Sequence, residues 1–172
     1  MTNRAGMTGL VLVAAILSAC QPVAIRDPFR PEAFGRTKDI CVIDETDTRR
    51  AFSPPDAFLV VDLLKAGLIS KGYSISPVCS DDQIQARVNV ITFASRDEPG
   101  RVGAFGMGHF YLDMINEVEV DIVFTDRDGL ISHGHLRDFS DDPIKVELAR
   151  KLINAYLKNI PDAPGSGTQG HR

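Results

Sequence analysis

Residues 116–139 read NEVEVDIVFTDRDGLISHGHLRDF and decide the fold. Apolar residues stand at every second position of the first half, with acidic residues between most of them. The apolar positions are Val118, Val120, Ile122 and Phe124, and the acidic ones are Glu117, Glu119 and Asp121. A period of two is typical of a strand that buries one face and exposes the other. The DRDG segment at 126–129 fits a type I turn followed by a glycine bulge. The stretch therefore predicts an antiparallel hairpin.

The turn sets the register of this hairpin. If Asp126 faces Leu130, the buried side pairs Phe124 with Ser132, Ile122 with Gly134, and Val120 with Leu136. The solvent-exposed side then pairs Asp121 with His135 and Glu119 with Arg137. The buried side needs a covering layer, which the flanking sequence supplies as two amphipathic segments.

The first covering segment is a predicted helix over 54–71. Ser53 can cap it, Pro54 suits its first position, and Gly72 suits the turn that ends it. Its apolar stripe consists of Phe58, Val61, Leu64 and Leu68, broadened by Leu59, Leu63 and Ile69. A second helix is expected to begin after Asp142 and to end before Pro161. Its apolar stripe consists of Leu148, Ala149, Leu152, Ile153, Tyr156, Leu157 and Ile160.

Three further strands are expected at 38–44, 73–78 and 86–94, where β-branched residues cluster between turn residues. The first two flank the first helix, and such a crossover places its two strands parallel. The glycine-rich segment 95–108 reads as a loop, because its spacing matches no phosphate-binding motif. The order β-α-β-β-β-β-α predicts an α+β fold: a two-layer sandwich whose mixed sheet carries both main helices on one face.

The N-terminal stretch LVLVAAILSAC, residues 10–20, indicates export. Its apolar run of about ten residues is too short to span a bilayer, and Arg4 precedes it without an acidic residue. This is the layout of a cleaved signal peptide, here residues 1–19. The last four residues, Leu17, Ser18, Ala19 and Cys20, resemble the lipobox of bacterial lipoproteins. The resemblance implies that the Cys20 thiol is acylated and becomes the new N-terminus.

In lipoproteins as a class, an aspartate after the acylated cysteine favours retention at the inner membrane. Gln21 stands there instead, so the resemblance implies the periplasmic face of the outer membrane, with the inner membrane as the alternative. Cleavage leaves about 150 residues, enough for one domain. The expected layout is a lipidated tether at 20–37, a single domain at 38–160 and a disordered tail at 161–172.

The three cysteines of the chain have two expected roles, lipid attachment for one and a disulfide for the other two. With Cys20 assigned to lipid, Cys41 and Cys79 form an even pair in an oxidising compartment, and we expect a disulfide between them. A redox-active pair is the alternative, but no C-x-x-C motif is present to lower a thiol pKa.

The composition and motifs bound the function. A formal charge of −4 leaves no general basic surface, so nucleic acid is not an expected partner. No nucleophile elbow, P-loop or zinc spacing occurs, and no cofactor is expected. His133 and His135 have the two-residue spacing of a possible metal site, to which His109 and Asp113 could add ligands. Pairing with cross-strand acids already accounts for both histidines as exposed charge complements, and we favour that interpretation. A metal-dependent or hydrolytic periplasmic enzyme using His109, His133 and His135 therefore stays an alternative.

The chain also resembles uncharacterised small envelope lipoproteins with a two-layer α/β domain. The matching residues are Cys41, Val42, Ile43, Leu68, Gly72, Tyr73, Gly129, Leu130 and Gly134. Lipoproteins of secretion and conjugation machines and the curli-secretion lipoprotein share parts of this plan by analogy. The leading hypothesis is a membrane-anchored, non-enzymatic binding or assembly module that contacts envelope proteins. A small-ligand carrier would need a pocket between the sheet and the helices.

Overall fold

The computed structural model describes residues 23–26, 28–47, 54–99, 112–140 and 145–166. Within these ranges it contains β1 (Val23–Arg26), the 3-10 helix η1 (Pro31–Gly35), β2 (Asp39–Asp44), α2 (Pro54–Ser70), β3 (Ser74–Ser76), β4 (Ile84–Pro99), β5 (Leu112–Asp126), β6 (Gly129–Ser140) and α3 (Lys145–Leu157). Among the helices described, neither length nor apolar character suffices for a membrane span.

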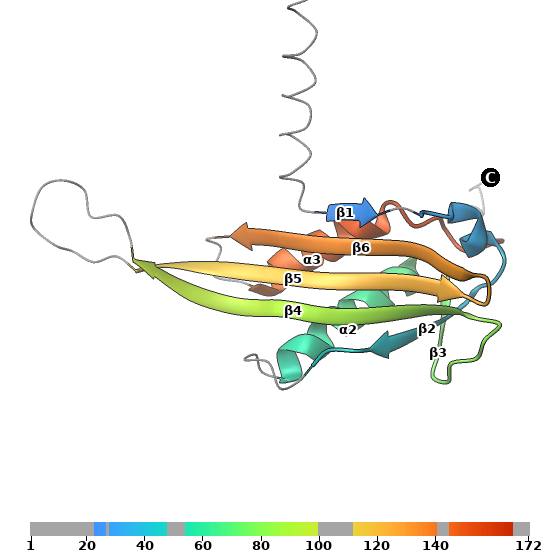
Figure 1. Cartoon of the computed structure of the whole chain (residues 1–172), viewed down its shortest axis with the longest axis horizontal. Helices are drawn as coiled ribbons and strands as arrows, with labels where there is room; N and C mark the ends of the chain where they lie inside the picture. Colours follow the sequence, from blue (N-terminus) through green and yellow to red (C-terminus); the bar gives the residue numbers. More distant parts are fainter. Residues whose placement is uncertain (1–22, 27, 48–53, 100–111, 141–144, 167–172) are drawn as a thin grey trace, which may run out of the picture.

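The strands form one six-stranded sheet in the order β1-β6-β5-β4-β2-β3. β1, β6, β5 and β4 pair antiparallel with one another in that order, whereas β2 runs parallel to both β4 and β3. α2 packs on β2, β3 and β4, and α3 packs on β6 and β5 and touches β1, so both helices cover the same face (Figure 1). This confirms the predicted α+β sandwich with a mixed sheet. We call the side that carries none of the described helices the open face.

The register of the β5–β6 hairpin is as predicted along its body. Phe124 pairs with Ser132, Ile122 with Gly134, Val120 with Leu136, Asp121 with His135, and Glu119 with Arg137. The prediction is wrong at the turn, where Asp126 pairs with Gly129 rather than with Leu130. The loop has only two residues, and Gly129 takes a positive φ of 108°. The extra residue is therefore Ile131, which bulges after the turn and is fully buried.

α2 ends as the sequence predicts but buries a narrower stripe. Gly72 has a φ of 88°, and the N–H groups of Gly72 and Tyr73 donate to the carbonyls of Ile69 and Leu68, closing a Schellman motif. Phe58 and Ile69, expected in the buried stripe, are 56% and 57% exposed, whereas Val60 is buried. The reason is helical phase: α2 is covered by the sheet and by α3, and positions 58 and 69 lie on its remaining side. All seven apolar positions predicted for the second helix are buried.

The expected tether is part of the domain. Residues 23–26 form β1, which pairs with β6, and η1 buries Ala33 and Phe34. The Phe34 ring lies 5.2 Å from the ring of Phe124 and 6.4 Å from that of Tyr73, centroid to centroid. The prediction of a tether over 20–37 is therefore wrong for its described residues. Phe34 is therefore part of the hydrophobic core.

Two other segments are more ordered than the sequence indicates. Residues 95–99, expected in a loop, continue β4 and pair with β5 from Ser95↔Asn116 to Pro99↔Leu112, because the partner strand supplies the hydrogen bonds. Residues 100–108 of that loop lie outside the described ranges. The expected disordered tail is packed at its start: Ala163 is buried, and its N–H donates to the carbonyl of Lys71 over 2.9 Å.

Two buried tyrosines predict alkaline sensitivity. Burial, with a smaller contribution from Asp162, raises the pKa of Tyr73 to about 12, and burial also raises the pKa of Tyr156. An unfolded tyrosine ionises near pH 10. Above that pH the unfolded state binds fewer protons than the native state, so stability falls as pH rises from 10 through 12, by about 1–3 kcal/mol per tyrosine. Urea midpoints at rising pH would measure this. In the double variant Tyr73→Phe/Tyr156→Phe, the urea midpoint should fall less steeply between pH 10 and pH 12 than in the native chain. An equally steep fall in both would contradict the attribution of the alkaline sensitivity to these tyrosines.

Candidate functional site

The open face carries a band of charged and polar side chains that we call the polar ladder. It consists of Glu117, Glu119 and Asp121 on β5 and His133, His135 and Arg137 on β6. They share this face because side chains alternate along each strand and their neighbours point into the core. The register places Asp121 opposite His135 and Glu119 opposite Arg137, as the sequence predicts, whereas Glu117 stands opposite Phe139.

Asp121 lies between the two imidazole rings of the ladder. Its Oδ1 is 2.8 Å from His135 Nδ1 and 3.5 Å from His133 Nε2. The other ring nitrogen of His135 lies 3.5 Å from Glu119 Oε1. All three contacts cross from β5 to β6, so each imidazole faces a carboxylate of the same hairpin.

Arg137 binds the most deeply buried acid of the ladder. Its Nη2 and Nε donate to Glu117 Oε1 over 2.9 and 3.3 Å, and its Nε lies 3.7 Å from Glu119 Oε2. Its guanidinium also stacks 5.1 Å from the centroid of the Phe139 ring. Because the Glu117 side chain is only 2% exposed, this charge-assisted pairing offsets the desolvation of the carboxylate.

The ladder does not gather a metal centre. Over the described ranges, no group of three or more His, Cys, Asp or Glu side chains is placed to hold a metal ion. Asp113 lies on β5, eight positions from Asp121 and about 27 Å along the strand. His109 lies outside the described residues. Ser132, next to His133 in sequence, is buried on the opposite face, where its Oγ lies 3.1 Å from the Tyr156 hydroxyl. Ser132 and His133 therefore do not form a nucleophile–base pair.

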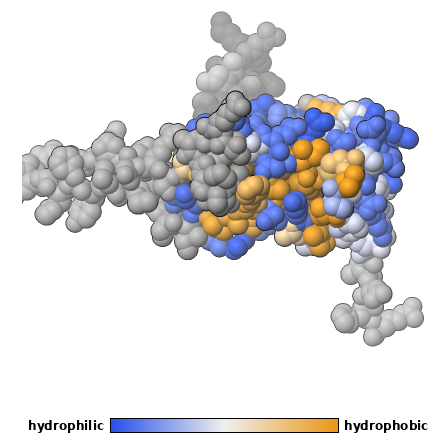
Figure 2. All heavy atoms as spheres, turned by 90° about the horizontal axis from the view of Figure 1, so that it is seen from below, coloured by the Kyte–Doolittle hydropathy of each residue, from blue (hydrophilic) through white to orange (hydrophobic). Residues whose placement is uncertain are grey.

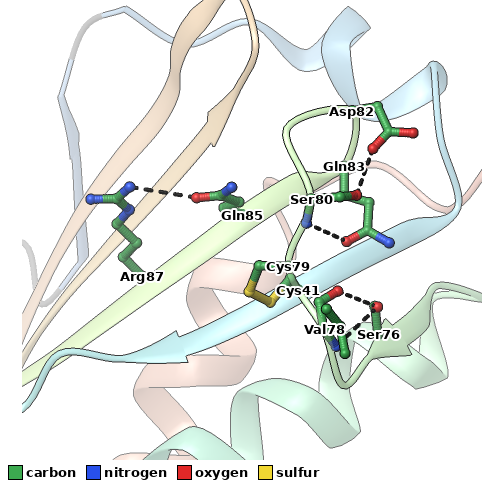
Figure 3. The surroundings of a disulfide bond; sticks show 9 residues. All are labelled: Cys41, Ser76, Val78, Cys79, Ser80, Asp82, Gln83, Gln85 and Arg87. Carbon is green, nitrogen blue, oxygen red and sulfur yellow. Dashed lines mark hydrogen bonds between the residues drawn. A yellow bond between two sulfur atoms is a disulfide. The ribbon is translucent and has the colours of Figure 1, made fainter.

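The disulfide joins Cys41 and Cys79, the pair that the sequence indicates (Figure 3). β2 and β3 are adjacent and parallel, with Cys41 beside Ser76, so the chain leaving β3 passes the buried Cys41. Hydrogen bonds hold this turn: Ser76 Oγ donates to the Val78 carbonyl, and the Ser80 N–H donates to Gln83 Oε1. Cys20 lies outside the described residues.

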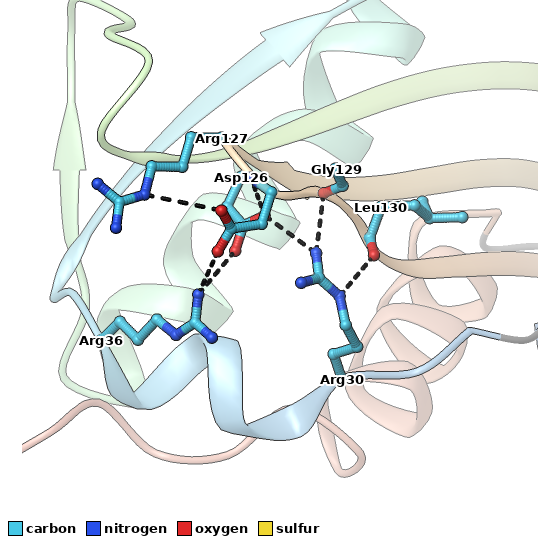
Figure 4. Close-up of polar contacts among 7 residues, drawn as sticks. Arg30, Arg36, Asp126, Arg127, Gly129 and Leu130 are labelled. Atoms are coloured by element: carbon cyan, nitrogen blue, oxygen red, sulfur yellow. Dashed lines mark hydrogen bonds and ion pairs between the residues drawn. The ribbon is translucent and has the colours of Figure 1, made fainter.

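A second cluster, which sequence reasoning missed, holds the N-terminal segment to the β5–β6 turn (Figure 4). We call Arg30, Arg36 and Asp126 the arginine clasp. Arg30 donates through Nη2 to Asp126 Oδ1 over 3.0 Å and through Nε to the Leu130 carbonyl over 2.8 Å. Arg36 Nη1 lies 2.6 Å from Asp128 Oδ2 and 3.8 Å from Asp126 Oδ2. Arginines before residue 37 and acids in the DRDG turn were visible in the sequence, but nothing there indicated that they meet.

Two open cavities border the clasp, with volumes of about 220 and 490 Å³. Asp126 and Arg127 line both cavities. Arg36 and Asp82 also line the smaller cavity, and Arg87 also lines the larger one. Their walls mix both signs of charge and carry no aromatic side chain. They lie at the turn end of the sheet and not between the sheet and the helices, where a carrier would hold its ligand.

The clasp predicts a measurable loss of stability. Arg30→Ala removes hydrogen bonds to Asp126 and to two turn carbonyls, and we expect it to lower the free energy of unfolding by about 2 kcal/mol. Arg87→Ala is the matched control, because the Arg87–Glu45 pair is 3.4 Å long and nearly half exposed, so its loss should change stability by less than about 1 kcal/mol. Urea denaturation measures both, and equal effects would argue against the clasp.

Comparison with known proteins shows what the fold resembles. Neither a family model nor a curated relative matches the sequence. The PelC dodecamer from Paraburkholderia phytofirmans is similar in structure, with a TM-score of 0.55 and 15% identity, covering 82% of this chain and 99% of PelC. A point variant of that protein gives a TM-score of 0.53 and 14% identity over 80% of this chain and 96% of its own. At this identity the likeness shows a shared fold.

Lipoprotein GNA1162 from Neisseria meningitidis is a more distant neighbour. It covers 70% of this chain and 95% of its own, at 14% identity and a TM-score of 0.42. A similarity this weak carries no argument about function.

Proposed function

We propose that this chain is a lipid-anchored, non-enzymatic envelope protein whose domain faces the periplasm from the outer membrane and serves as an assembly module. The observation that carries the proposal is the division of its cysteines. Cys41 and Cys79 are joined within the domain, which suits an oxidising compartment. Cys20 is left at the end of a lipobox-like sequence, where acylation would anchor the chain.

Assembly rather than catalysis is supported by the surface. The polar ladder pairs its charges internally, whereas several large apolar residues of the described ranges are exposed: Phe58, Ile69, Val78 and Phe139. Figure 2 shows hydrophobic residues gathered among hydrophilic ones on one side of the molecule. Contact with another protein would remove them from water. The similar PelC structure is a dodecamer, and we extend this to the proposal that copies of the present chain are among its partners.

Acylation is tested by mass spectrometry and membrane fractionation of the full chain. We expect the mature N-terminal peptide to begin at an acylated Cys20 and the protein to sediment with membranes. Cys20→Ser should abolish both, whereas Cys79→Ser, the same change at a bridge cysteine, should leave the anchor in place. Recovery of the unaltered chain in the cytosol with its leader intact would overturn the proposal.

Assembly is tested by crosslinking intact envelopes and purifying the chain. Crosslinked species containing several copies, or this chain with another envelope protein, are the expected result. Recovery of a lone monomer across a range of crosslinker lengths would count against an assembly role while leaving the anchor untouched.

A further inference from the structure

We infer that the β1–β6 edge of the sheet lies directly against the membrane surface, with acidic phospholipid headgroups as its partner. The inference rests on the proposed acylation of Cys20. It adds an orientation: one edge of the sheet is seated on the bilayer, and the opposite edge, made of β2 and β3, points away from it.

The first argument is the length of the chain between lipid and domain. β1 begins at Val23, three residues after Cys20. Three fully extended residues reach about 11 Å at most, so the acylated cysteine must lie within that distance of Val23. β1 is the edge strand of the sheet, paired through four positions with β6 and followed by η1, which buries Ala33 and Phe34. Such an anchor cannot hold the domain away from the bilayer.

The second argument is the distribution of charge. Arg26 is exposed on β1 and makes no ion pair with any described residue. On the open face the adjacent β6 carries His133, His135 and Arg137. Their partners, the acids of the polar ladder, lie one strand further from the edge, so Arg26 is the side chain of this edge that is left to meet a headgroup.

Charged side chains in the helix layer are distributed in the same way, with bases near β1 and β6. α3, which packs on β6 and β5 and touches β1, carries more bases than acids: Lys145, Glu147, Arg150 and Lys151. The distant side of the domain exposes several acids: Asp44, Glu45, Asp62, Asp81 and Asp82. The basic edge is therefore the one that the anchor holds at the membrane, and acidic headgroups complement it.

The consequence is a defined outward side. Five strand spacings separate β1 from β3, about 24 Å across the sheet. The disulfide and α2, with its exposed Phe58 and Ile69, are thereby turned toward the periplasm, where another protein can reach them.

The test compares one labelled position in each edge strand of the full lipidated chain. Ala24 on β1 and Ser74 on β3 are both small and exposed, and each is replaced by cysteine, with the native disulfide kept oxidised. A fluorophore on the new thiol is quenched by nitroxide-headgroup lipids in phosphatidylethanolamine–phosphatidylglycerol vesicles. We expect the label on Ala24→Cys to be quenched several-fold more than the label on Ser74→Cys. Equal quenching, a reversed ratio or none at either position would overturn the inference.

A spacer separates the contributions of anchor and charge. Inserting 18 Gly/Ser residues between Pro22 and Val23 gives a linker with a root-mean-square span of about 24 Å. We expect it to abolish the difference between labels on phosphatidylcholine vesicles and to leave part of it on vesicles with phosphatidylglycerol. The same ratio on both vesicle types would overturn the role of acidic headgroups. Failure of the unaltered chain to float with any vesicles would instead overturn the proposed anchor.

Discussion

Replacing Gly134 by alanine is expected to lower the free energy of unfolding by about 3 kcal/mol, toward the upper end of the usual cost of overpacking a core. Gly134 lies at the centre of β6 on the covered face, opposite Ile122. A Cβ at this position would overlap three ring atoms of Tyr156. That ring is fully buried and stacks on Phe124 with centroids 6.2 Å apart, so it cannot move without displacing the packing between α3 and the sheet.

Two other glycines are controls for this prediction. At Gly35 no atom lies within 4 Å of an added Cβ, so Gly35→Ala should be nearly neutral in urea denaturation. At Gly67 the added Cβ would meet Leu157 Cδ1, the movable end of a flexible side chain. Gly67→Ala also gains helix propensity, and it should destabilise less than Gly134→Ala. If Gly134→Ala were as stable as Gly35→Ala, the close packing of Tyr156 on β6 would be contradicted.

The parts of the fold that could be predicted are those that local periodicity determines. Alternation from Val118 to Phe124 fixes which face of β5 is buried, and with a short turn it also fixes the partners on β6. The turn itself was predicted one residue wrong, because the choice between a bulge at Gly129 and one at Ile131 depends on whether the Ile131 side chain can enter the core. That choice is made by tertiary packing.

The N-terminal segment shows why the rest was missed. Between Pro28 and Thr37 the apolar residues are few and follow no period, so the sequence reads as a linker. Their burial depends on distant residues: Phe34 packs on Phe124 and Tyr73, and Arg30 binds Asp126, 96 positions away. Contacts at such separations leave no local signal. The same limit explains Ala163, whose partner Lys71 lies in the turn after α2.

In the candidate site, too, contacts set by strand register could be predicted and contacts set by tertiary packing could not. The cross-strand pairs of the polar ladder could be predicted, since strand register alone places Asp121 beside His135 and Glu119 beside Arg137. The bidentate contact of Arg137 with Glu117 could not, because it runs diagonally across the hairpin and depends on side-chain conformation. Predicting the disulfide needed both the parity of the cysteines and the crossover that makes β2 and β3 neighbours.

Removing that disulfide is the prediction with the largest expected effect. The Cys41→Ser/Cys79→Ser variant should lose about 4 kcal/mol of unfolding free energy, because the bridge closes a loop of 38 residues and so restricts the unfolded chain. The loop contains all of α2 and β3, and its opening frees the edge of the sheet farthest from β1. Urea denaturation of the oxidised chain and of the variant measures the difference.

Reduction of the native chain separates the loss of the bridge from the change of side chain. Cys41 is 2% exposed, so a serine there also buries a hydroxyl, whereas the reduced chain keeps both thiols in place. The reduced chain should therefore lose most of the same free energy, and the variant slightly more. Reductant should leave the midpoint of the variant unchanged. Equal midpoints for the oxidised native chain, its reduced form and the variant would mean that the bridge contributes nothing, and the oxidising compartment would lose its structural support.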